Sequence, residues 1–126
     1  MSAVSIEFKF ITPVLRILDV AKAREFYLDY LGFSVDFEHR FDDNAPLYMG
    51  LSRGNLRIHL TEHHGDAIPG AAIRIRVTGI EALHRELRAE NYRYFRPSLD
   101  DTEWNTREVR LIDPFGNRIL FYEPKP

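Results

Sequence analysis

Apolar side chains follow two periodicities along the chain, and these occur twice in the same order. In residues 19–33 and 78–90 they recur every three to four positions, which predicts amphipathic helices. Around these segments they alternate with polar residues over short runs, which predicts half-buried strands. Strands are expected at residues 10–18, 33–41, 46–52 and 56–61, and again at 72–77, 92–98, 106–112 and 118–123. The pattern therefore predicts two βαβββ units.

Residues at the ends of these segments predict their boundaries. Asp19 can accept a hydrogen bond from the first turn of the first helix, and Gly32 can adopt the left-handed conformation that ends it. Thr78 and Glu81 have the spacing of a capping box at the start of the second helix. Pro13 has no backbone N–H, so the first strand is expected at a sheet edge or interrupted there.

The similar order of the two halves, each with a Gly-Asn turn signal, indicates an internal duplication. We expect one domain over residues 1–126. Its first module spans about residues 8–62 and its second about 71–124, with a connector containing Gly and Pro between them.

Strand alternation also predicts which side chains face the helices. The expected inward set is aliphatic and aromatic: Leu56, Ile58, Leu60, Ile73, Ile75, Val77, Ile119 and Phe121. The opposite face carries a more polar set: Thr12, Val14, Arg16, Arg57, His59, Thr61, Ala72, Arg74, Arg76, Arg118, Leu120 and Tyr122. This second face is either the lining of a hydrated cup, if the sheets curl together, or a solvated sheet surface.

Composition narrows the functional classes. With 44% hydrophobic and 29% charged residues, the chain has the content of an ordinary globular domain. It has no cysteine, which excludes disulfides, thiolate metal sites and thiol catalysis. A net charge of −2 gives no reason to expect nucleic-acid binding, and no apolar run approaches the ~20 residues that span a membrane. The first ten residues lack the basic start and apolar centre of a signal peptide, so a cytoplasmic protein is expected.

Two segments, "LDVAKAREFYLDYLGFSVDFE" and "EWNTREVRLIDPFGNRILFYE", resemble the vicinal-oxygen-chelate superfamily. This superfamily includes glyoxalase I, extradiol dioxygenases and bleomycin resistance proteins, and the resemblance is strongest to the last group. It implies an α+β fold in which two paired βαβββ modules form curled mixed sheets around a cup, with the helices outside. It also implies a homodimer, either side by side or with the N-terminal arm exchanged at Pro13.

Enzymes of that superfamily hold a divalent cation with four cup residues. The resemblance puts these positions at Thr12, His59, Ala72 and Leu120. Alanine and leucine offer no donor atom, and one imidazole cannot hold a catalytic cation because even an open zinc site needs three protein ligands. We therefore expect no metal and no other cofactor. The alternative is a relocated metal site near His63, His64 and Asp66.

Trp104, the only tryptophan, lies in a polar loop and lacks the alternating apolar neighbours of a core residue. Its ring suits a flat aromatic or cationic ligand, by stacking and cation–π attraction. The resemblance implies that Trp104 stacks on a drug, and that Phe37 and Phe41 face it across a dimer groove. The alternative is that Trp104 covers an interface. The expected ligand-binding residues are Trp104, Phe37, Phe41, His59, Arg107, Glu103, Arg57 and Tyr122.

The charge of the predicted cup departs from the resemblance. Bleomycin is cationic, whereas arginines are frequent on the polar face. Acidic loop residues could make the mouth of the groove negative, the arginines could pair with acids such as Glu38 or Glu123, or the ligand could be anionic. The sequence leaves these three explanations open.

The residues favour a binding protein over an enzyme. We expect metal-independent binding and sequestration of a bleomycin-type glycopeptide antibiotic, or of a similar aromatic small molecule, with drug resistance as the result. One alternative is a superfamily enzyme, a lyase, isomerase or dioxygenase-like protein, with a relocated metal or with His59 as general base. Another is a structural module in which Trp104 is buried against a partner.

Overall fold

The fold consists of two four-stranded sheets and two helical segments. The computed structural model describes residues 5–94 and 96–126. Its elements are, in chain order, β1 (Val14–Arg16), α1 (Val20–Arg24), the π-helix η1 (Glu25–Tyr30), β2 (Ser34–His39), β3 (Tyr48–Arg53), β4 (Leu56–Thr61), β5 (Ala72–Arg76), α2 (Ile80–Ala89), β6 (Asp100–Asp101), β7 (Thr106–Ile112) and β8 (Arg118–Pro124).

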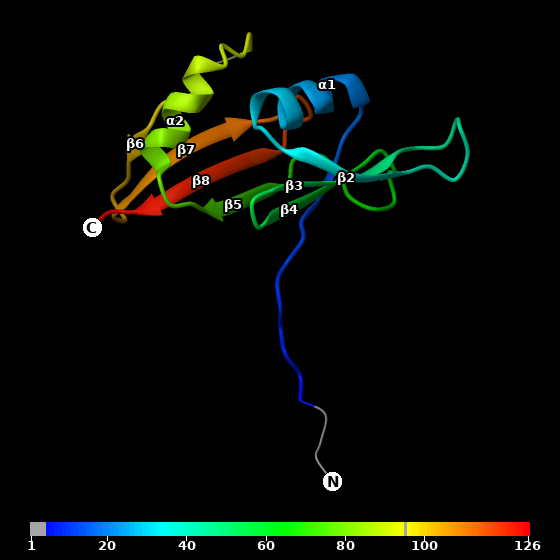
Figure 1. Cartoon of the computed structure of the whole chain (residues 1–126), viewed down its shortest axis with the longest axis horizontal. Helices are drawn as coiled ribbons and strands as arrows, with labels where there is room; N and C mark the ends of the chain where they lie inside the picture. The colour runs from blue at the N-terminus through cyan, green and yellow to red at the C-terminus, as the bar shows by residue number, and fades with distance from the viewer. Residues whose placement is uncertain (1–4, 95) are drawn as a thin grey trace.

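Sheet A has the strand order β1-β4-β3-β2 and sheet B the order β5-β8-β7-β6, so equivalent strands of the two halves occupy equivalent positions. In each sheet one edge pair is parallel and the other pairs are antiparallel. The helices lie on one side of the sheets (Figure 1). This is the predicted α+β arrangement of mixed sheets, and within the described ranges the sheets do not close on each other. We call the sheet surface turned away from the helices the open face.

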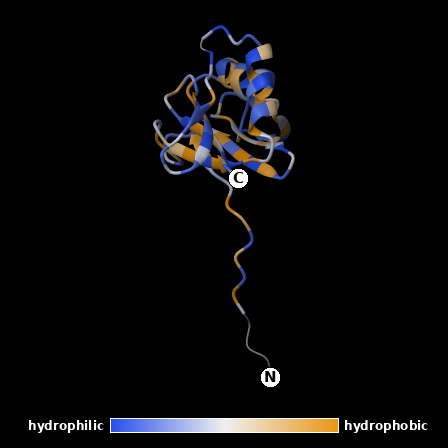
Figure 2. Cartoon of the chain, turned by 90° about the vertical axis from the view of Figure 1, so that its left-hand side faces the viewer, coloured by the Kyte–Doolittle hydropathy of each residue, from blue (hydrophilic) through white to orange (hydrophobic). Residues whose placement is uncertain are grey.

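The N-terminal residues leave this body as an extended arm on the side away from the helices (Figure 1). Apolar and polar residues alternate along the arm (Figure 2). Ile6, Phe8 and Phe10 are 85%, 95% and 78% exposed, and residues 5–13 form no regular strand. The arm therefore carries a strand-like pattern without a covered face. β1 itself begins after Pro13 and lies at a sheet edge, as predicted.

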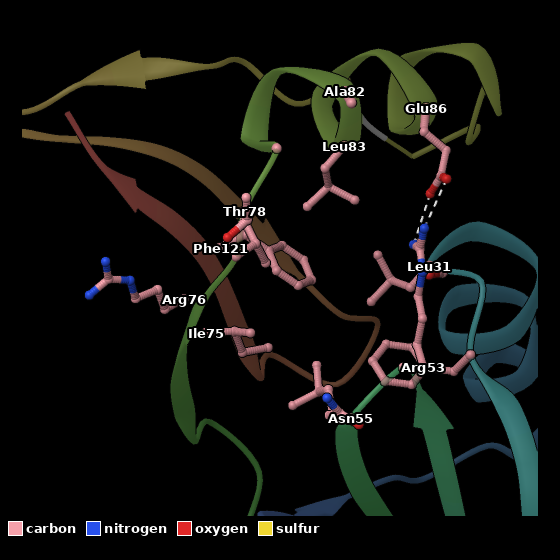
Figure 3. Close-up of a pocket in the computed structure, with 15 residues that line it drawn as sticks. Leu31, Arg53, Asn55, Ile75, Arg76, Thr78, Ala82, Leu83, Glu86 and Phe121 are labelled. Carbon is pink, nitrogen blue, oxygen red and sulfur yellow. Dashed lines mark hydrogen bonds and ion pairs between the residues drawn. The ribbon is translucent and has the colours of Figure 1, made fainter. Parts of the chain in front are cut away.

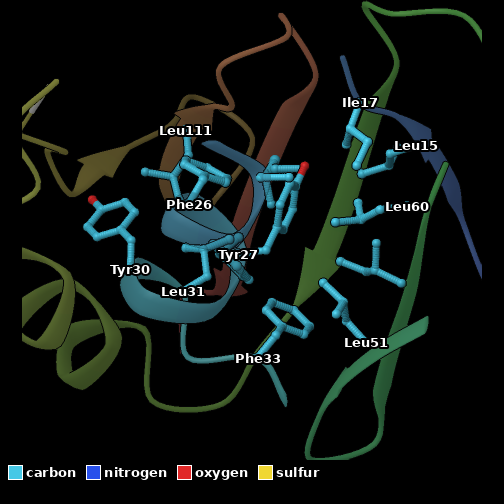
Figure 4. Packing of buried hydrophobic residues seen from close by; sticks show 14 of the residues in the cluster. Leu15, Ile17, Phe26, Tyr27, Tyr30, Leu31, Phe33, Leu51, Leu60 and Leu111 are labelled. Carbon is cyan, nitrogen blue, oxygen red and sulfur yellow. The ribbon is translucent and has the colours of Figure 1, made fainter. Parts of the chain in front are cut away.

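The hydrophobic core lies between the helices and the inward faces of both sheets (Figure 4). Of the residues predicted to point inward, Ile58, Leu60, Ile119 and Phe121 are buried. The others are half-buried and pack against the same cluster: Leu56, Ile73, Ile75 and Val77. The predicted inward set is therefore confirmed, and its half-buried members mark where sheet B is less completely covered.

The first helical segment begins and ends at the predicted residues. The Asp19 side chain accepts a hydrogen bond from the Lys22 amide at 2.9 Å, and Gly32 has a φ of 77° just past the end. Its second part is a π-helix, in which Phe26, Tyr27 and Tyr30 are all buried.

A bilayer-spanning helix would need greater length and apolar content than any helix in the described residues has.

Two local predictions are wrong. The second helix does not start with a Thr78–Glu81 capping box, because the Glu123 carboxylate of β8 accepts from the amides of Gly79 and Ile80 at 3.1 and 3.2 Å. The carboxylate of Glu81 is instead bound by Arg107. Glu123 lies far along the chain, so local spacing gives no sign of this cap.

The strand expected over residues 92–98 does not form in residues 92–94 or 96–98. Residue 95 lies outside the described residues. Tyr92 turns into the core and stacks on Tyr30, with ring centroids 4.5 Å apart. Asn91 precedes it with a φ of 54°, which starts a turn instead of a strand. The short strand β6 takes the edge position in sheet B.

The turn "DPFGN" between β7 and β8 joins the two halves through buried polar groups. The Asp113 carboxylate accepts from the Tyr27 hydroxyl at 2.6 Å and from the Asn117 side-chain amide at 2.9 Å. The Asn117 amide also donates to the Arg16 carbonyl at 2.9 Å, and its oxygen accepts from the amide of Ala71 at 3.1 Å. Burial raises the pKa of the Tyr27 hydroxyl, and the charge of Asp113 and the hydrogen bond to it raise it further. The turn therefore fixes how the modules sit on each other.

Candidate ligand-binding site

Trp104 lies in a short loop that two threonines hold in place. The hydroxyls of Thr102 and Thr106 are 2.7 Å apart, and the Thr106 amide donates to the Thr102 hydroxyl at 3.1 Å. The Trp104 indole N–H donates to Oε2 of Glu108 at 3.0 Å, while 58% of the residue stays exposed. The loop thus fixes the indole by its N–H edge and leaves much of its surface accessible.

The carboxylate of Glu108 is fully buried under this loop. It accepts from the Thr106 hydroxyl at 2.8 Å and pairs with Arg74 at 2.9 Å and Arg110 at 3.1 Å. Burial alone would raise the pKa of Glu108, but the hydrogen bonds from Thr106, Trp104, Arg74 and Arg110 outweigh it and lower the pKa to about 2. Glu108 is therefore a fixed anion at neutral pH.

Tyr122 continues the group along the open face of sheet B. It is the register partner of Glu108 in β7 and of Arg76 in β5. The guanidinium carbon of Arg74 lies 4.0 Å from the centroid of the Tyr122 ring, within cation–π range. Arg74 is thus held by a ring and by a buried carboxylate together, which restricts a side chain that is otherwise flexible.

On sheet A, Phe37, Tyr48 and His59 form an aromatic cluster. The Phe37 and Tyr48 rings lie 14° from parallel with centroids 6.2 Å apart, and Phe37 meets His59 edge-on at 5.3 Å. The Tyr48 hydroxyl is 2.7 Å from Nδ1 of His59. Phe37 fits here because its register partner is Gly50, where a Cβ would overlap the Phe37 ring. Phe37 is 44% exposed, so this cluster presents an aromatic surface on sheet A in addition to the one at Trp104 on sheet B.

The predicted ligand-binding residues therefore fall into two groups on different sheets. Trp104 and Tyr122 lie around Glu108 on sheet B, and Phe37 and His59 lie together on sheet A. Arg57 is exposed two positions from His59 on β4, so strand alternation puts it on the same face. Phe41 lies in the β2–β3 loop, 80% exposed, edge-on to His39 and His63.

Two predicted residues do not join either group. Arg107 pairs with Glu81 of α2 and with Asp101, at 3.3 Å, on the side of β7 opposite to Glu108. It follows Thr106 in a strand, and successive side chains point to opposite faces. Glu103 is exposed in the loop beside Trp104.

Sequence reasoning missed Glu108 and Arg110 as members of the site. The alternation of "TREVRLI" does place both on the polar side of their strand, which was the available signal. Tyr48 was missed because its partner His59 lies on the neighbouring strand, and the register between strands is not visible in one sequence.

The four positions implied for a metal do not fit one. Nδ1 of His59 is hydrogen-bonded to Tyr48, and Ala72 and Leu120 offer no donor atom. No group of three His, Asp or Glu side chains suited to a metal occurs in residues 5–94 and 96–126. This includes the segment with His63 and Asp66, where Asp66 accepts from the Thr61 hydroxyl at 2.7 Å.

A cleft of about 670 Å³ lies on the helix side of sheet B, between α2 and the β3–β4 turn (Figure 3). Its walls include Phe33, Ile75 and Leu83, and the ion pair between Arg53 and Glu86 spans it with N–O distances of 2.8 and 2.9 Å. None of the predicted ligand-binding residues lines it. The two groups of predicted ligand-binding residues lie on the open face of sheet B and of sheet A, away from this cleft.

The chain is similar over nearly its whole length to known proteins. The family described as "Glyoxalase superfamily protein" matches residues 2–126. A bleomycin resistance protein from Geobacillus stearothermophilus is 30% identical over 129 residues, which cover 88% of this chain and 93% of the relative. A bleomycin-binding protein from bleomycin-producing Streptomyces verticillus, solved with copper(II)-bleomycin, is 31% identical with a TM-score of 0.69, covering 93% and 97% of the two chains. A glyoxalase-related enzyme from Clostridium phytofermentans shares the fold at 21% identity and a TM-score of 0.73, covering 94% and 97%.

Proposed function

The chain belongs to the glyoxalase superfamily, with bleomycin resistance proteins among its relatives, and on this premise we propose that it binds and sequesters a flat aromatic small molecule without a bound metal. A bleomycin-type glycopeptide antibiotic is the first candidate, because two relatives carry that activity in their names. Sequestration of such a drug in the cytoplasm would confer resistance. We propose neither a nucleic-acid partner nor a membrane partner.

The observation that carries this proposal is the way Trp104 is held. A buried anion fixes the N–H edge of the indole, and more than half of the residue is accessible. A preorganised ring loses little conformational freedom when a ligand stacks on it, so more of the contact energy appears as affinity. A tryptophan that merely filled the core would be buried.

We further propose a homodimer. The arm presents Ile6, Phe8 and Phe10 to solvent, and packing these residues on a second copy would cover them. With the arm exchanged at Pro13, two equivalent grooves would form, each placing Phe37 of one subunit opposite Trp104 of the other. A two-fold dimer requires this equivalence.

The test is a titration with copper-free and copper-loaded bleomycin. Because Trp104 is the only tryptophan, its emission reports on this ring alone. We expect saturable quenching by at least one form, and at least a ten-fold weaker dissociation constant by calorimetry for Trp104→Ala. Absence of binding by both methods would contradict drug binding. Stoichiometric zinc, nickel or iron in the purified protein, lost together with binding, would contradict metal independence.

A second candidate is superfamily enzyme chemistry with His59 as general base. The hydrogen bond between the Tyr48 hydroxyl and Nδ1 of His59 fixes the orientation of the His59 ring, as a catalytic imidazole requires. A lyase or isomerase activity that disappears in His59→Ala, while Trp104→Ala retains it, would favour this function over drug binding.

A further inference from the structure

Four arginines lie together on the open face of sheet B, and we call them the arginine cluster: Arg74, Arg76, Arg110 and Arg118. Strand register fixes their arrangement. Leu120 of β8 is flanked by Arg74 and Arg110, and Arg76 and Arg118 lie two positions from this row in opposite directions along the strands. Neighbouring strands are about 4.8 Å apart and a strand rises about 3.3 Å per residue, so Arg76 and Arg118 start roughly 13 Å apart along the strands, with Arg74 and Arg110 between them.

The acids of the protein do not neutralise this cluster. Glu108 serves both Arg74 and Arg110, and Arg76 and Arg118 have no ion pair among the described residues. Asp100, which register places opposite Glu108, accepts from the Ser98 hydroxyl. With Glu108 and Asp100 counted against the four arginines, the sheet residues of this face carry +2, and Glu103 in the adjacent loop lowers this to +1, although the whole chain carries −2.

The two acids that the sequence offered as partners are engaged elsewhere. Glu38 pairs with Arg24 beside α1, and Glu123 caps the amides at the start of α2. Internal ion pairs therefore account for Arg74 and Arg110, through Glu108, but not for Arg76 and Arg118. Guanidinium groups bind carboxylate, sulfonate and phosphate groups in a planar, two-pronged geometry. Positive charge therefore remains available beside the aromatic platform at Trp104, which shares Glu108 with Arg74 and Arg110.

We propose that the ligand of this site is an aromatic compound with an acidic group, a carboxylate, sulfonate or phosphate, and that Arg76 or Arg118 binds that group while Trp104 stacks on the ring. This inference rests on the proposed binding of a flat aromatic molecule, and within that function it favours an acidic aromatic ligand over the cationic bleomycin. Arg74 and Arg110 are held by Glu108 and contribute positive potential.

The test compares three naphthalenes of the same shape and different charge by calorimetry: 2-naphthoate, 2-naphthylmethanol and 2-naphthylmethylammonium. We expect 2-naphthoate to bind at least ten-fold more tightly than the ammonium compound, and the preference to shrink with added salt. Arg76→Ala/Arg118→Ala should abolish the preference. Arg85→Ala/Arg88→Ala, which removes two exposed charges from α2, should keep it.

The outcomes separate this inference from the proposed function. Equal affinity for the three compounds, or tighter binding of the cation, would overturn the acidic-ligand inference while aromatic binding stands. Binding of copper-free bleomycin without binding of any naphthalene would do the same. Failure of every compound, bleomycin included, would overturn the inference and the proposed function together.

Discussion

Trp104 and Glu108 are joined by a hydrogen bond of 3.0 Å between the indole N–H and a carboxylate that has no exposed surface. One residue is largely accessible and the other is fully enclosed, so a change in the buried charge acts directly on the exposed ring. The same carboxylate holds Arg74 and Arg110. The orientation of the aromatic platform and the position of two guanidinium groups therefore depend on one side chain.

Trp104→Ala should weaken ligand binding much more than it weakens the fold. Removing an exposed ring leaves little void, so we expect a stability loss near that of one hydrogen bond, about 1 kcal/mol. The binding loss should be roughly 2 kcal/mol or more, as for an interface hot spot. Denaturant melts and ligand titrations provide the two measurements.

The matched control for that variant is Phe121→Ala. Phe121 is 5% exposed on the helix side of β8, and its truncation should cost roughly 3–5 kcal/mol of stability. If Trp104→Ala destabilised the protein as much as Phe121→Ala, the Trp104 ring would be structural and the stacking role would be wrong.

Glu108 should make stability depend on acid pH. Its pKa in the folded protein, about 2, is below the ordinary value of 4.5, so its contribution is present above pH 4.5 and is lost as pH falls through 2. The difference corresponds to on the order of 3 kcal/mol. Melts of the native protein and of Glu108→Gln from pH 6 to 2 should show a steeper loss for the native protein. Parallel curves would mean that Glu108 does not titrate in this way.

Gly50→Ala should disturb the aromatic cluster on sheet A. The added methyl group occupies the space of the Phe37 ring, which must move away from Tyr48 and His59. We expect a stability loss of roughly 1–3 kcal/mol, typical of overpacking, and weaker ligand binding if Phe37 faces the groove. Gly65→Ala is the control, since a methyl group there meets no atom within 4 Å. Unchanged binding in Gly50→Ala would remove Phe37 from the site.

Asn117→Ala should destabilise the protein by roughly 3 kcal/mol or more. It leaves the Arg16 carbonyl and the amides of Gly70 and Ala71 without their partner in a largely buried region. Asn44→Ala, in an exposed loop, should change stability by less than about 0.5 kcal/mol. Similar melting temperatures for the two variants would contradict the joining role of the "DPFGN" turn.

The protein should sediment as a dimer at micromolar concentration. Phe8→Ser/Phe10→Ser should shift it toward monomer, because the exposed apolar side chains of the arm would no longer cover a partner surface. Ile68→Ser removes an equally exposed apolar residue, 77% accessible, outside the arm and should leave the dimer intact. A monomeric native protein would refute the dimer and its two grooves.

Periodicity predicted the helices, the inward sheet face and the edge position of β1, because each depends on residues close together in the chain. It failed at residues 92–98, where "YRYFRPS" has the composition of a strand but Tyr92 packs into the core beside Tyr30. It also failed at the start of α2, where Glu123 replaces a local capping box. In both cases a contact between distant segments decided the local conformation.

For the candidate site too, features set by local sequence were predictable and features set by contacts between distant segments were not. Trp104 was identifiable from its polar neighbours, and alternation placed Tyr122 and His59 on the open face. The function of Glu108 was not identifiable, because it depends on enclosure by Arg74 from β5 and by the loop before β7. Arg107 was assigned to the site because it adjoins Trp104 in sequence, although strand alternation turns it toward α2.

The "DPFGN" turn also has a consequence for how the chain gains its structure. Each duplicated half supplies buried partners that the other half needs: Tyr27 and Arg16 from the first, Asp113 and Asn117 from the second. Neither half alone satisfies its own enclosed donors and acceptors, so a fragment ending in the connector would not be autonomous. We expect one cooperative unfolding transition for the whole chain, and amide protons of β4 and β8 that exchange together with solvent although they belong to different sheets.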